Sequence, residues 1–479
     1  MQYSIVQYSE VFSLESDSRL DSEFYKPNLI KSYRNLKSKP FTFLGSKDFY
    51  VTDGEHGSPD WDVNSGIKYI TAENIEKNLI KETDFANISE SQNTRNTRSI
   101  LKDTDVLLYS VGAYCGNAAK MERHLLPANI PRSVAIIRAK SKIFNPSYIS
   151  TFLNTEYGTF QTERLKAGNA QPMLALEQIK KIAIPNLLED FQLKISDICD
   201  KSYYLRTEAK SLYQQAEDLL LEELGLKDWK PKHQLSYVKN YSDTQHAERF
   251  DAEYFQPQYD AIIERIKNYK NGFSSLGKEG KFTSGSFVSD SFYSESGTPY
   301  IRIKELSYKG SIDKEKMIFL DKKFKPKNET RVFESDFVIA TIGNTIGKVN
   351  IIDKELSGAI PSNNTSKYEL NNKDNSFFFH VLLQSPVVQK QIEREYTQTA
   401  QPKISDSSLS NIVIPSIDNH KKNLISEKMQ NSFKNKGESK SLLEIAKKAV
   451  EIAIESNEEK ATKWIDQELE KLGVRLSGN

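Results

Sequence analysis

The chain contains an internal duplication, which constrains its fold more than any single motif does. The stretch RLDSEFYKP at residues 19–27 returns as RFDAEYFQP at residues 249–257. Tyr69 in GIKYITAENI returns as Tyr300 in GTPYIRIKEL, at an offset of 231. Other matches keep this offset to within one position, so the chain consists of two copies of one structural unit.

The later parts of the two copies match in the same way. DVLLYSVGAYCGNAAK from Asp105 returns as DFVIATIGNTIGKVNI from Asp336 and keeps both glycines, and IAIP ending at Pro185 returns as IVIP ending at Pro415. Each copy combines short β-branched or aromatic runs, bounded by Gly, Asn and Pro, with helical stretches. We therefore expect an α+β domain in each copy.

An acidic helical segment separates the copies. From Glu189 to Gly225 the chain has nine acidic and four basic residues, a net charge of −5, so the remainder carries +6 to give the total of +1. Apolar and small residues recur there at alternating steps of four and three, the seam of a coiled coil. An ordinary amphipathic helix packed on a core is the alternative. The seam positions are Phe191, Ile195, Ile198, Ser202, Leu205, Ala209, Leu212, Ala216 and Leu219.

The second copy ends in a longer helical region. LEELGL from Leu221 is matched by LEKLGV from Leu469, an offset of 248 in place of 230, which implies 18 additional residues. The stretch KNKGESK at 434–440 contains Gly437, so we expect a break or kink there. Because the two helical regions must pair, we expect the additional residues to fold back or project.

These patterns divide the chain into four parts. We expect an α+β domain at residues 1–186, a helical spacer and linker at 187–232, a second α+β domain at 233–416 and a terminal helical spacer at 417–479. The fold class is α+β, with two pseudo-symmetric domains in tandem, each followed by a long helix.

Composition narrows the class of protein. The 479 residues are 38% hydrophobic and 27% charged, which is typical of a globular protein, and no apolar run is long enough to span a bilayer. The first residues, MQYSIVQYSEVFSLES, have neither the basic nor the apolar part of a signal peptide. The only cysteines are Cys115 and Cys199, too few for a disulfide framework. We predict a cytoplasmic protein.

Two motifs resemble catalytic ones without completing them. GNTIGKV at 343–349 is one residue short of a phosphate-binding loop and has Val349 where a hydroxyl is needed, so a turn between paired strands is the better interpretation. NPSY at 145–148 resembles the Asn-Pro-Pro-Tyr motif of amino-methyltransferases, but no glycine-rich cofactor loop accompanies it. We expect Asn145 to cap a helix that begins with Pro146.

No arrangement of residues predicts a metal site or a nucleophile. Glu73 and Asp60 could be nuclease carboxylates, but the second copy has Lys304 opposite Glu73, so exposed strand charges explain them better. The histidines are scattered, without the spacing of metal ligands. They are His56, His124, His233, His246, His380 and His420.

The order and duplication of these motifs resemble the specificity subunit of type I restriction-modification systems over essentially the whole chain. In that family each α+β unit is a target-recognition domain, and the two helices pair antiparallel as a spacer. The resemblance implies a non-catalytic subunit that binds double-stranded DNA together with two copies of a modification (methyltransferase) subunit. No cofactor is expected in this chain, and S-adenosylmethionine is expected on the partners. Whether restriction subunits join them stays open.

The two copies differ in sequence where two domains that recognise different DNA sequences should differ. Residues 28–66 of the first copy and residues 258–297 of the second have almost no sequence similarity to each other, although the flanking motifs persist. Two different readers imply a split, asymmetric DNA target.

Candidate DNA contacts follow from position and residue type. Arg and Lys suit guanine or phosphate and Asn suits adenine, although a solvated strand charge is the common alternative. In or beside the Tyr-Ile strand they are Lys68, Thr71, Asn74, Arg302 and Lys304. A second group comprises Ser110, Tyr114, Asn117, Arg132, Thr341, Asn344, Lys348 and Asn363.

Three alternatives remain beside this interpretation. A self-contained methyltransferase or nuclease would need a cofactor loop or carboxylate cluster that the sequence lacks. A purely structural coiled-coil scaffold would explain the helices but not the divergent α+β units. The same reader could also serve a solitary methyltransferase or another phage-defence system.

Overall fold

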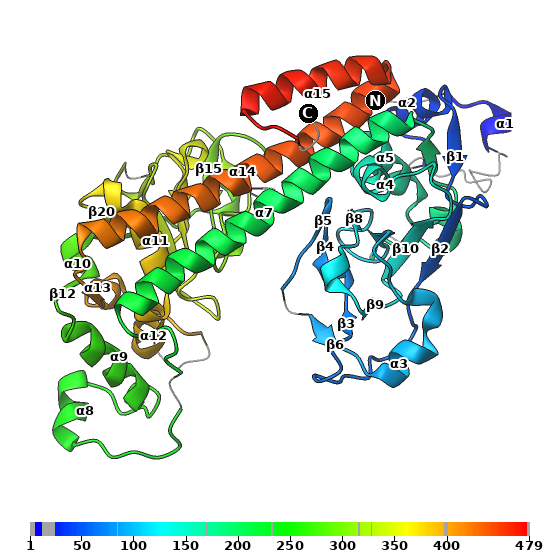
Figure 1. Ribbon diagram of the computed structural model, residues 1–479. Coiled ribbons are helices and arrows are strands. Elements are labelled where there is room, and N and C mark those ends of the chain that lie inside the picture. Colours follow the sequence, from blue (N-terminus) through cyan, green and yellow to red (C-terminus); the bar gives the residue numbers. More distant parts are fainter. Residues whose placement is uncertain are drawn as a thin grey trace. The chain divides into compact units, whose positions relative to one another are not determined.

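The computed structural model describes residues 5–11, 24–83, 85–167, 171–230, 233–314, 317–326, 328–396 and 401–476. The opening motif of the first copy lies outside these residues as far as position 23. The chain forms two compact units, of which unit 1 comprises Met1–Arg206 with Lys436–Asn479 and unit 2 comprises Thr207–Asn435. Figure 1 labels their elements.

Unit 1 is built on a four-stranded antiparallel sheet in the order β2-β10-β7-β8. Both faces of this sheet are covered: Val106 and Leu108 of β7 face the core that includes α4, whereas Leu107 and Tyr109 face a second core. A strand that is buried on both faces needs apolar residues at every position, which explains the run VLLY. The elements are α1 (Tyr8–Val11), α2 (Pro27–Lys37), β1 (Phe41–Phe43), β2 (Phe49–Asp53), β3 (Lys68–Tyr69), β4 (Ile75–Glu76), β5 (Leu79–Ile80), β6 (Ala86–Asn87), α3 (Glu90–Arg95), β7 (Asp105–Tyr109), β8 (Ala118–Lys120), β9 (Ala128–Asn129), β10 (Val134–Ala139), α4 (Pro146–Leu153), α5 (Glu156–Leu165), α6 (Leu176–Ile179) and β11 (Ala183–Pro185).

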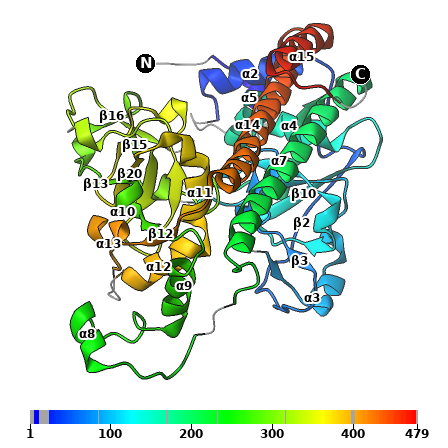
Figure 2. The same cartoon turned by 60° about the vertical axis from the view of Figure 1, so that its left-hand side comes forward.

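Unit 2 repeats this sheet in the order β13-β20-β17-β18. The register repeats as well, because Val106 pairs with Ile137 in unit 1 and Phe337 pairs with Tyr368 in unit 2, both members of the pair being shifted by 231. Helix α11 packs against this sheet (Figure 2). The elements are α8 (Tyr241–Ala247), α9 (Pro257–Lys267), β12 (Phe273–Ser275), α10 (Leu276–Glu279), β13 (Gly280–Ser284), β14 (Tyr293–Ser294), β15 (Thr298–Ile301), β16 (Ile318–Leu320), β17 (Phe337–Ala340), β18 (Val349–Ile351), β19 (Ile360–Pro361), β20 (Thr365–Leu370), α11 (Ser376–Gln384), α12 (Pro386–Glu395), α13 (Asp406–Ser410) and β21 (Val413–Pro415).

The predicted fold class is confirmed, and so are several local predictions. Segment 343–348 connects the paired strands β17 and β18, as expected of a turn. Asn145 caps α4, since its side-chain oxygen accepts a hydrogen bond of 2.8 Å from the Ser147 amide, and Pro146 is the first helical residue.

Two long helices, α7 (Glu189–Glu223) and α14 (Asn419–Glu455), pair antiparallel. In unit 2 the Ser432 hydroxyl donates to the Ala209 carbonyl at 2.7 Å, and Lys421 lies 3.3 Å from Glu223. In unit 1 the Ser202 and Ser439 hydroxyl oxygens lie 2.8 Å apart. The coiled-coil prediction is therefore confirmed in each unit.

The seam of α7 departs from the predicted one near its carboxyl end. Phe191, Ile195, Ile198, Ser202, Leu205, Ala209 and Ala216 are buried as predicted. Leu212 and Leu219 are only half-buried, and Tyr213 and Leu220 take their places in the core. A straight helix has 3.6 residues per turn, so its buried face drifts by about 20° per heptad relative to a strict seven-residue repeat.

The predicted break at Gly437 is wrong, because α14 runs through this residue without interruption. The first residue of α14 is offset from that of α7 by 230 and the last by 232, so the additional residues follow α14. They form α15 (Glu458–Leu472), which folds back in unit 1 and places Asp466 2.6 Å from Lys194 (Figure 1). Packing of α14 on α7 outweighs the weak helix propensity of one glycine, which costs about 1 kcal/mol.

Candidate nucleic-acid interface

The strand positions predicted to contact DNA in unit 1 are largely engaged within the protein. Thr71 begins a short 3-10 helix, and its hydroxyl donates to the Asn74 side-chain oxygen at 2.9 Å. The buried Asn74 amide in turn donates to the carbonyls of Lys81 and Thr83 at 3.3 and 3.2 Å. Both side chains thus hold this loop in place, whereas Lys68 is half-buried on β3.

Side-chain contacts also hold the equivalent loop in unit 2. The Arg302 guanidinium lies 2.5 Å from the Glu305 carboxylate, and this carboxylate, only 1% exposed, also accepts the Arg302 backbone amide at 2.7 Å. Lys304, between them, has an exposed side chain. The first group of predicted residues therefore includes three that stabilise loops: Thr71, Asn74 and Arg302.

The second group gathers at one end of each four-stranded sheet. In unit 1 the Ser110 amide donates to the Ser133 carbonyl at 2.9 Å, which joins the end of β7 to the start of β10. In unit 2 the Thr341 amide donates to the Asn364 carbonyl at 3.0 Å. Of this group, Ser110 and Thr341 are buried, Asn117 and Lys348 are half-buried, and Tyr114, Arg132, Asn344 and Asn363 are exposed.

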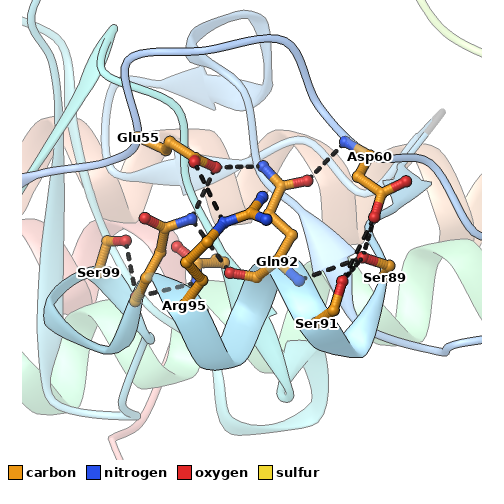
Figure 3. A network of polar contacts seen from close by, with 9 residues as sticks. Glu55, Asp60, Ser89, Ser91, Gln92, Arg95 and Ser99 are labelled. Atoms are coloured by element: carbon orange, nitrogen blue, oxygen red, sulfur yellow. Dashed lines mark hydrogen bonds and ion pairs between the residues drawn. The ribbon is translucent and has the colours of Figure 1, made fainter.

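A polar network in unit 1 fixes the loop that follows β2 (Figure 3). The amide group of Gln92, which is 1% exposed, lies between Glu55 and Asp60: it donates to the Glu55 carboxylate and accepts from the Asp60 backbone amide, both at 2.6 Å. The Asp60 carboxylate accepts the Ser89 hydroxyl at 2.5 Å. Both ends of the loop are therefore tied to α3.

Sequence analysis did not identify this network, although one signal was present. Ser89 caps α3 by accepting the Gln92 amide at 3.2 Å, and Ser-x-x-Gln is the pattern of a capping box. The contacts of Glu55 and Asp60 with the helix have no local signal, because they join residues that are far apart in the chain. Asp60, considered above as a nuclease carboxylate, is engaged in this network.

Burial shifts the pKa of several ionisable side chains in the two units. Burial, with the Glu55 carboxylate adding to it, raises the pKa of Tyr69 to about 12, and burial raises the pKa of its counterpart Tyr300 to about 12. Burial also raises the pKa of both thiols, Cys115 and Cys199, to about 11. These side chains are neutral at physiological pH, and the described part of the chain contains no group of three His, Cys, Asp or Glu residues that could hold a metal ion.

One protein-family model matches the larger part of unit 2 and the segment that follows it in α14. Residues 277–445 match the family model of the type I restriction modification DNA specificity domain. These residues extend from α10 into α14 and are similar to that domain, and the resemblance drawn from the sequence is thereby confirmed.

The solved structures to which this chain is similar include two specificity subunits. The S subunit of a type I restriction-modification system from M. genitalium is 12% identical, with a TM-score of 0.40 over 92% of this chain and 97% of the other. The HsdS subunit from Thermoanaerobacter tengcongensis is 11% identical, with a TM-score of 0.28 over 86% and 97%. No curated protein matches this chain.

No helix among the described residues is both long enough and apolar enough to cross a membrane.

Proposed function

We propose that this chain is the non-catalytic specificity subunit of a type I restriction-modification complex. In this proposal each unit reads one half of a split, asymmetric DNA target, and the chain directs methyltransferase partners, with or without restriction subunits, to that target. The match of residues 277–445 to the DNA specificity domain supports DNA reading by unit 2.

The repeated strand register extends the proposal to unit 1 and is the observation that carries it. Tyr69 pairs with Asn129 in unit 1 and Tyr300 pairs with Ile360 in unit 2, so a second pair of residues is also shifted by 231. Strand order and register are set by the whole fold rather than by a short motif. The proposal therefore treats unit 1 as a second reader of the same type, with different side chains.

The helical pair supports the expectation of two identical partners. Ser202 and Ala209 of α7 correspond to Ser432 and Ser439 of α14 at an offset of 230. Ser202 contacts Ser439, and Ser432 contacts Ala209, so the two contacts are equivalent under exchange of the helices. Surfaces related in this way can bind two copies of one protein. We expect these copies to be methyltransferase subunits that carry S-adenosylmethionine, in the cytoplasm.

A reader in a solitary modification system or in another phage-defence system would have the same architecture. A structural scaffold would share the helices but would not select DNA sequences. The enrichment of DNA sequences distinguishes the scaffold from the readers.

The test is a selection from random duplex DNA with the purified complex of this chain and the methyltransferase subunit of its own system. We expect enrichment of duplexes that share two short half-sites separated by an unspecified gap. The methyltransferase subunit alone is the control and should enrich none. A complex that forms but enriches no sequence would contradict the proposal and favour a scaffold.

A further inference from the structure

Four loops meet at one end of the four-stranded sheet in unit 2, and backbone hydrogen bonds join them in series. The Asn363 amide donates to the Ser286 carbonyl at 3.0 Å, which connects the loop before β20 to the loop after β13. The Thr341 amide donates to the Asn364 carbonyl at 3.0 Å, and the Ile404 amide donates to the Thr341 carbonyl at 3.0 Å. The Gly343 amide reaches the Pro402 carbonyl at 2.9 Å, so the fourth loop is fixed at two points.

Unit 1 contains the same four bonds at equivalent positions. The Arg132 amide donates to the Glu55 carbonyl at 3.2 Å, and the Ser110 amide donates to the Ser133 carbonyl at 2.9 Å. The remaining two are Leu174 to Ser110 at 2.8 Å and Gly112 to Pro172 at 2.9 Å. Each donor and acceptor is offset from its counterpart by 230 or 231, so one backbone frame is built twice.

The side chains that this frame exposes differ between the units. In unit 1 they include His56, exposed by 58%, and Tyr114, exposed by 43%. In unit 2 Phe287, exposed by 75%, occupies the position equivalent to His56. We call the following exposed residues the reading positions: His56, Tyr114, Arg132 and Met173 in unit 1, and Phe287, Asn344, Asn363 and Lys403 in unit 2.

We propose that the reading positions contact base edges and set the sequence that each unit recognises, an inference that rests on the proposed function. Arg132 can donate two hydrogen bonds to guanine, Asn363 can pair with adenine, and Phe287 can contact a thymine methyl group. Loops fixed on a rigid sheet present such side chains at a small entropic cost.

The difference between the units distinguishes DNA from a protein partner on this surface. Two copies of one partner protein would require similar side chains at equivalent positions of the frame. Arg132 and Asn363 are equivalent in the frame but differ in charge, and His56 and Phe287 differ in polarity. An asymmetric DNA target requires such a difference, because its two halves present different bases.

The polar network of unit 1 supports the same assignment. Glu55 and Asp60 tie both ends of the His56 loop to α3 through Gln92, and His56 itself lies 3.3 Å from the Asp53 carboxylate. Unit 1 thus uses a buried glutamine to fix an exposed loop.

The test repeats the selection from random duplex DNA with variants of the full chain in its methyltransferase complex. Arg132→Ala should relax one or two base pairs in one half-site, and Asn363→Ala should relax base pairs in the other half-site only. Loss of a bidentate base contact should reduce discrimination about 5- to 150-fold at that base pair. Lys267→Ala, an exposed residue on α9, is the matched control and should leave the motif unchanged.

The outcomes separate this inference from the proposed function. An unchanged motif in both variants, with enrichment still dependent on the chain, would overturn the inference and leave the proposed function intact. Enrichment that never depends on the chain would overturn the proposed function instead. Where a variant enriches nothing, its affinity for the wild-type motif is measured against duplexes altered one base pair at a time. If the variant binds all duplexes more weakly by the same factor, base reading is contradicted. If its affinity no longer depends on the base pairs of one half-site only, base reading is supported.

Discussion

The guanidinium of Arg394 lies 4.5 Å from the centre of the Tyr254 ring in unit 2. In unit 1 the guanidinium of Arg164 lies 3.9 Å from the centre of the Phe24 ring. Each aromatic residue belongs to the repeated opening motif, and each arginine is in the last turn of a helix, α12 or α5. In both copies an aromatic residue of the motif therefore contacts the same helix end.

Replacing Arg249 by Ala should lower the free energy of unfolding of unit 2. Arg249 donates two hydrogen bonds to the Asp251 carboxylate, at 2.7 and 2.9 Å, and others to carbonyls at the carboxyl end of α12, including that of Glu395 at 3.1 Å. Bonds of this charged type contribute about 1.5 to 3 kcal/mol, so we expect a loss of about that size in urea unfolding. Arg249→Lys should recover only part of it, because lysine lacks the planar fork. Equal stability of the wild type and Arg249→Ala would contradict this role.

Replacing Gly437 by Ala should stabilise the protein by about 0.5 to 1 kcal/mol. No atom lies within 4 Å of a Cβ added there, and α14 continues through this position. Gly473→Ala is the matched comparison, since Gly473 has equal space but a φ of +65° after α15, and should destabilise. Chemical denaturation measures both. A destabilising Gly437→Ala would indicate the kink that the sequence suggested.

Arg302 and Lys304 should respond differently to replacement by Ala. Arg302→Ala would leave the buried Glu305 carboxylate without its ion pair, and such a loss costs about 3 kcal/mol. Lys304→Ala should leave stability unchanged, because this side chain is exposed. Thermal unfolding of the two variants, compared with the wild type, checks the expectation. Equal effects of the two replacements would show that the Arg302–Glu305 ion pair contributes little to stability.

Stability should depend on pH through Glu223 at the end of α7. Lys270, together with the Tyr269 hydroxyl and Lys421, lowers the pKa of Glu223 from 4.5 to about 2, against the effect of burial. A carboxylate whose pKa is depressed by folding stabilises the protein above its unfolded pKa and loses this effect as pH falls through its folded pKa. The difference in unfolding free energy between the wild type and Glu223→Gln should be largest above about pH 4.5 and should vanish towards about pH 2.

Glu222→Gln is the control for this measurement. Glu222 is the neighbouring residue, its side chain is 51% exposed, and it pairs with Lys227 on the surface. Exposed pairs contribute little, so this variant should follow the wild type at every pH. A Glu223→Gln variant that does the same would contradict the assigned role of Glu223.

Much of the fold could be predicted because its signals are local or repeated. The duplication indicated the two domains, and the helix start at Asn145 followed from capping chemistry alone. Leu212 and Leu219 were predicted as seam positions, but Tyr213 and Leu220 are buried there instead, because a strict heptad template does not allow for the drift of about 20° per heptad in a helix of 3.6 residues per turn. The additional residues fold back as expected, as α15, but their place along the chain was wrong, because the likeness of LEKLGV to LEELGL placed them inside the helix rather than after it.

The candidate site was less predictable. Residue type alone identified Arg132 and Asn363, and both lie at exposed positions of the repeated frame. It also selected Thr71, Asn74 and Arg302, whose side chains are engaged in local contacts: Thr71 pairs with Asn74 and Arg302 with Glu305, each three residues apart at the start of a short 3-10 helix. His56 and Phe287 carry no motif, and their equivalence depends on hydrogen bonds between loops far apart in the chain.

The central claim is tested most directly by sequencing methylated bases in the DNA of a host. One strain expresses the methyltransferase subunit alone and a second expresses it together with this chain. The account predicts that a split motif with an unspecified central gap is methylated only in the second strain. The same methylation pattern in both strains, although the two proteins purify together, would contradict DNA reading by this chain.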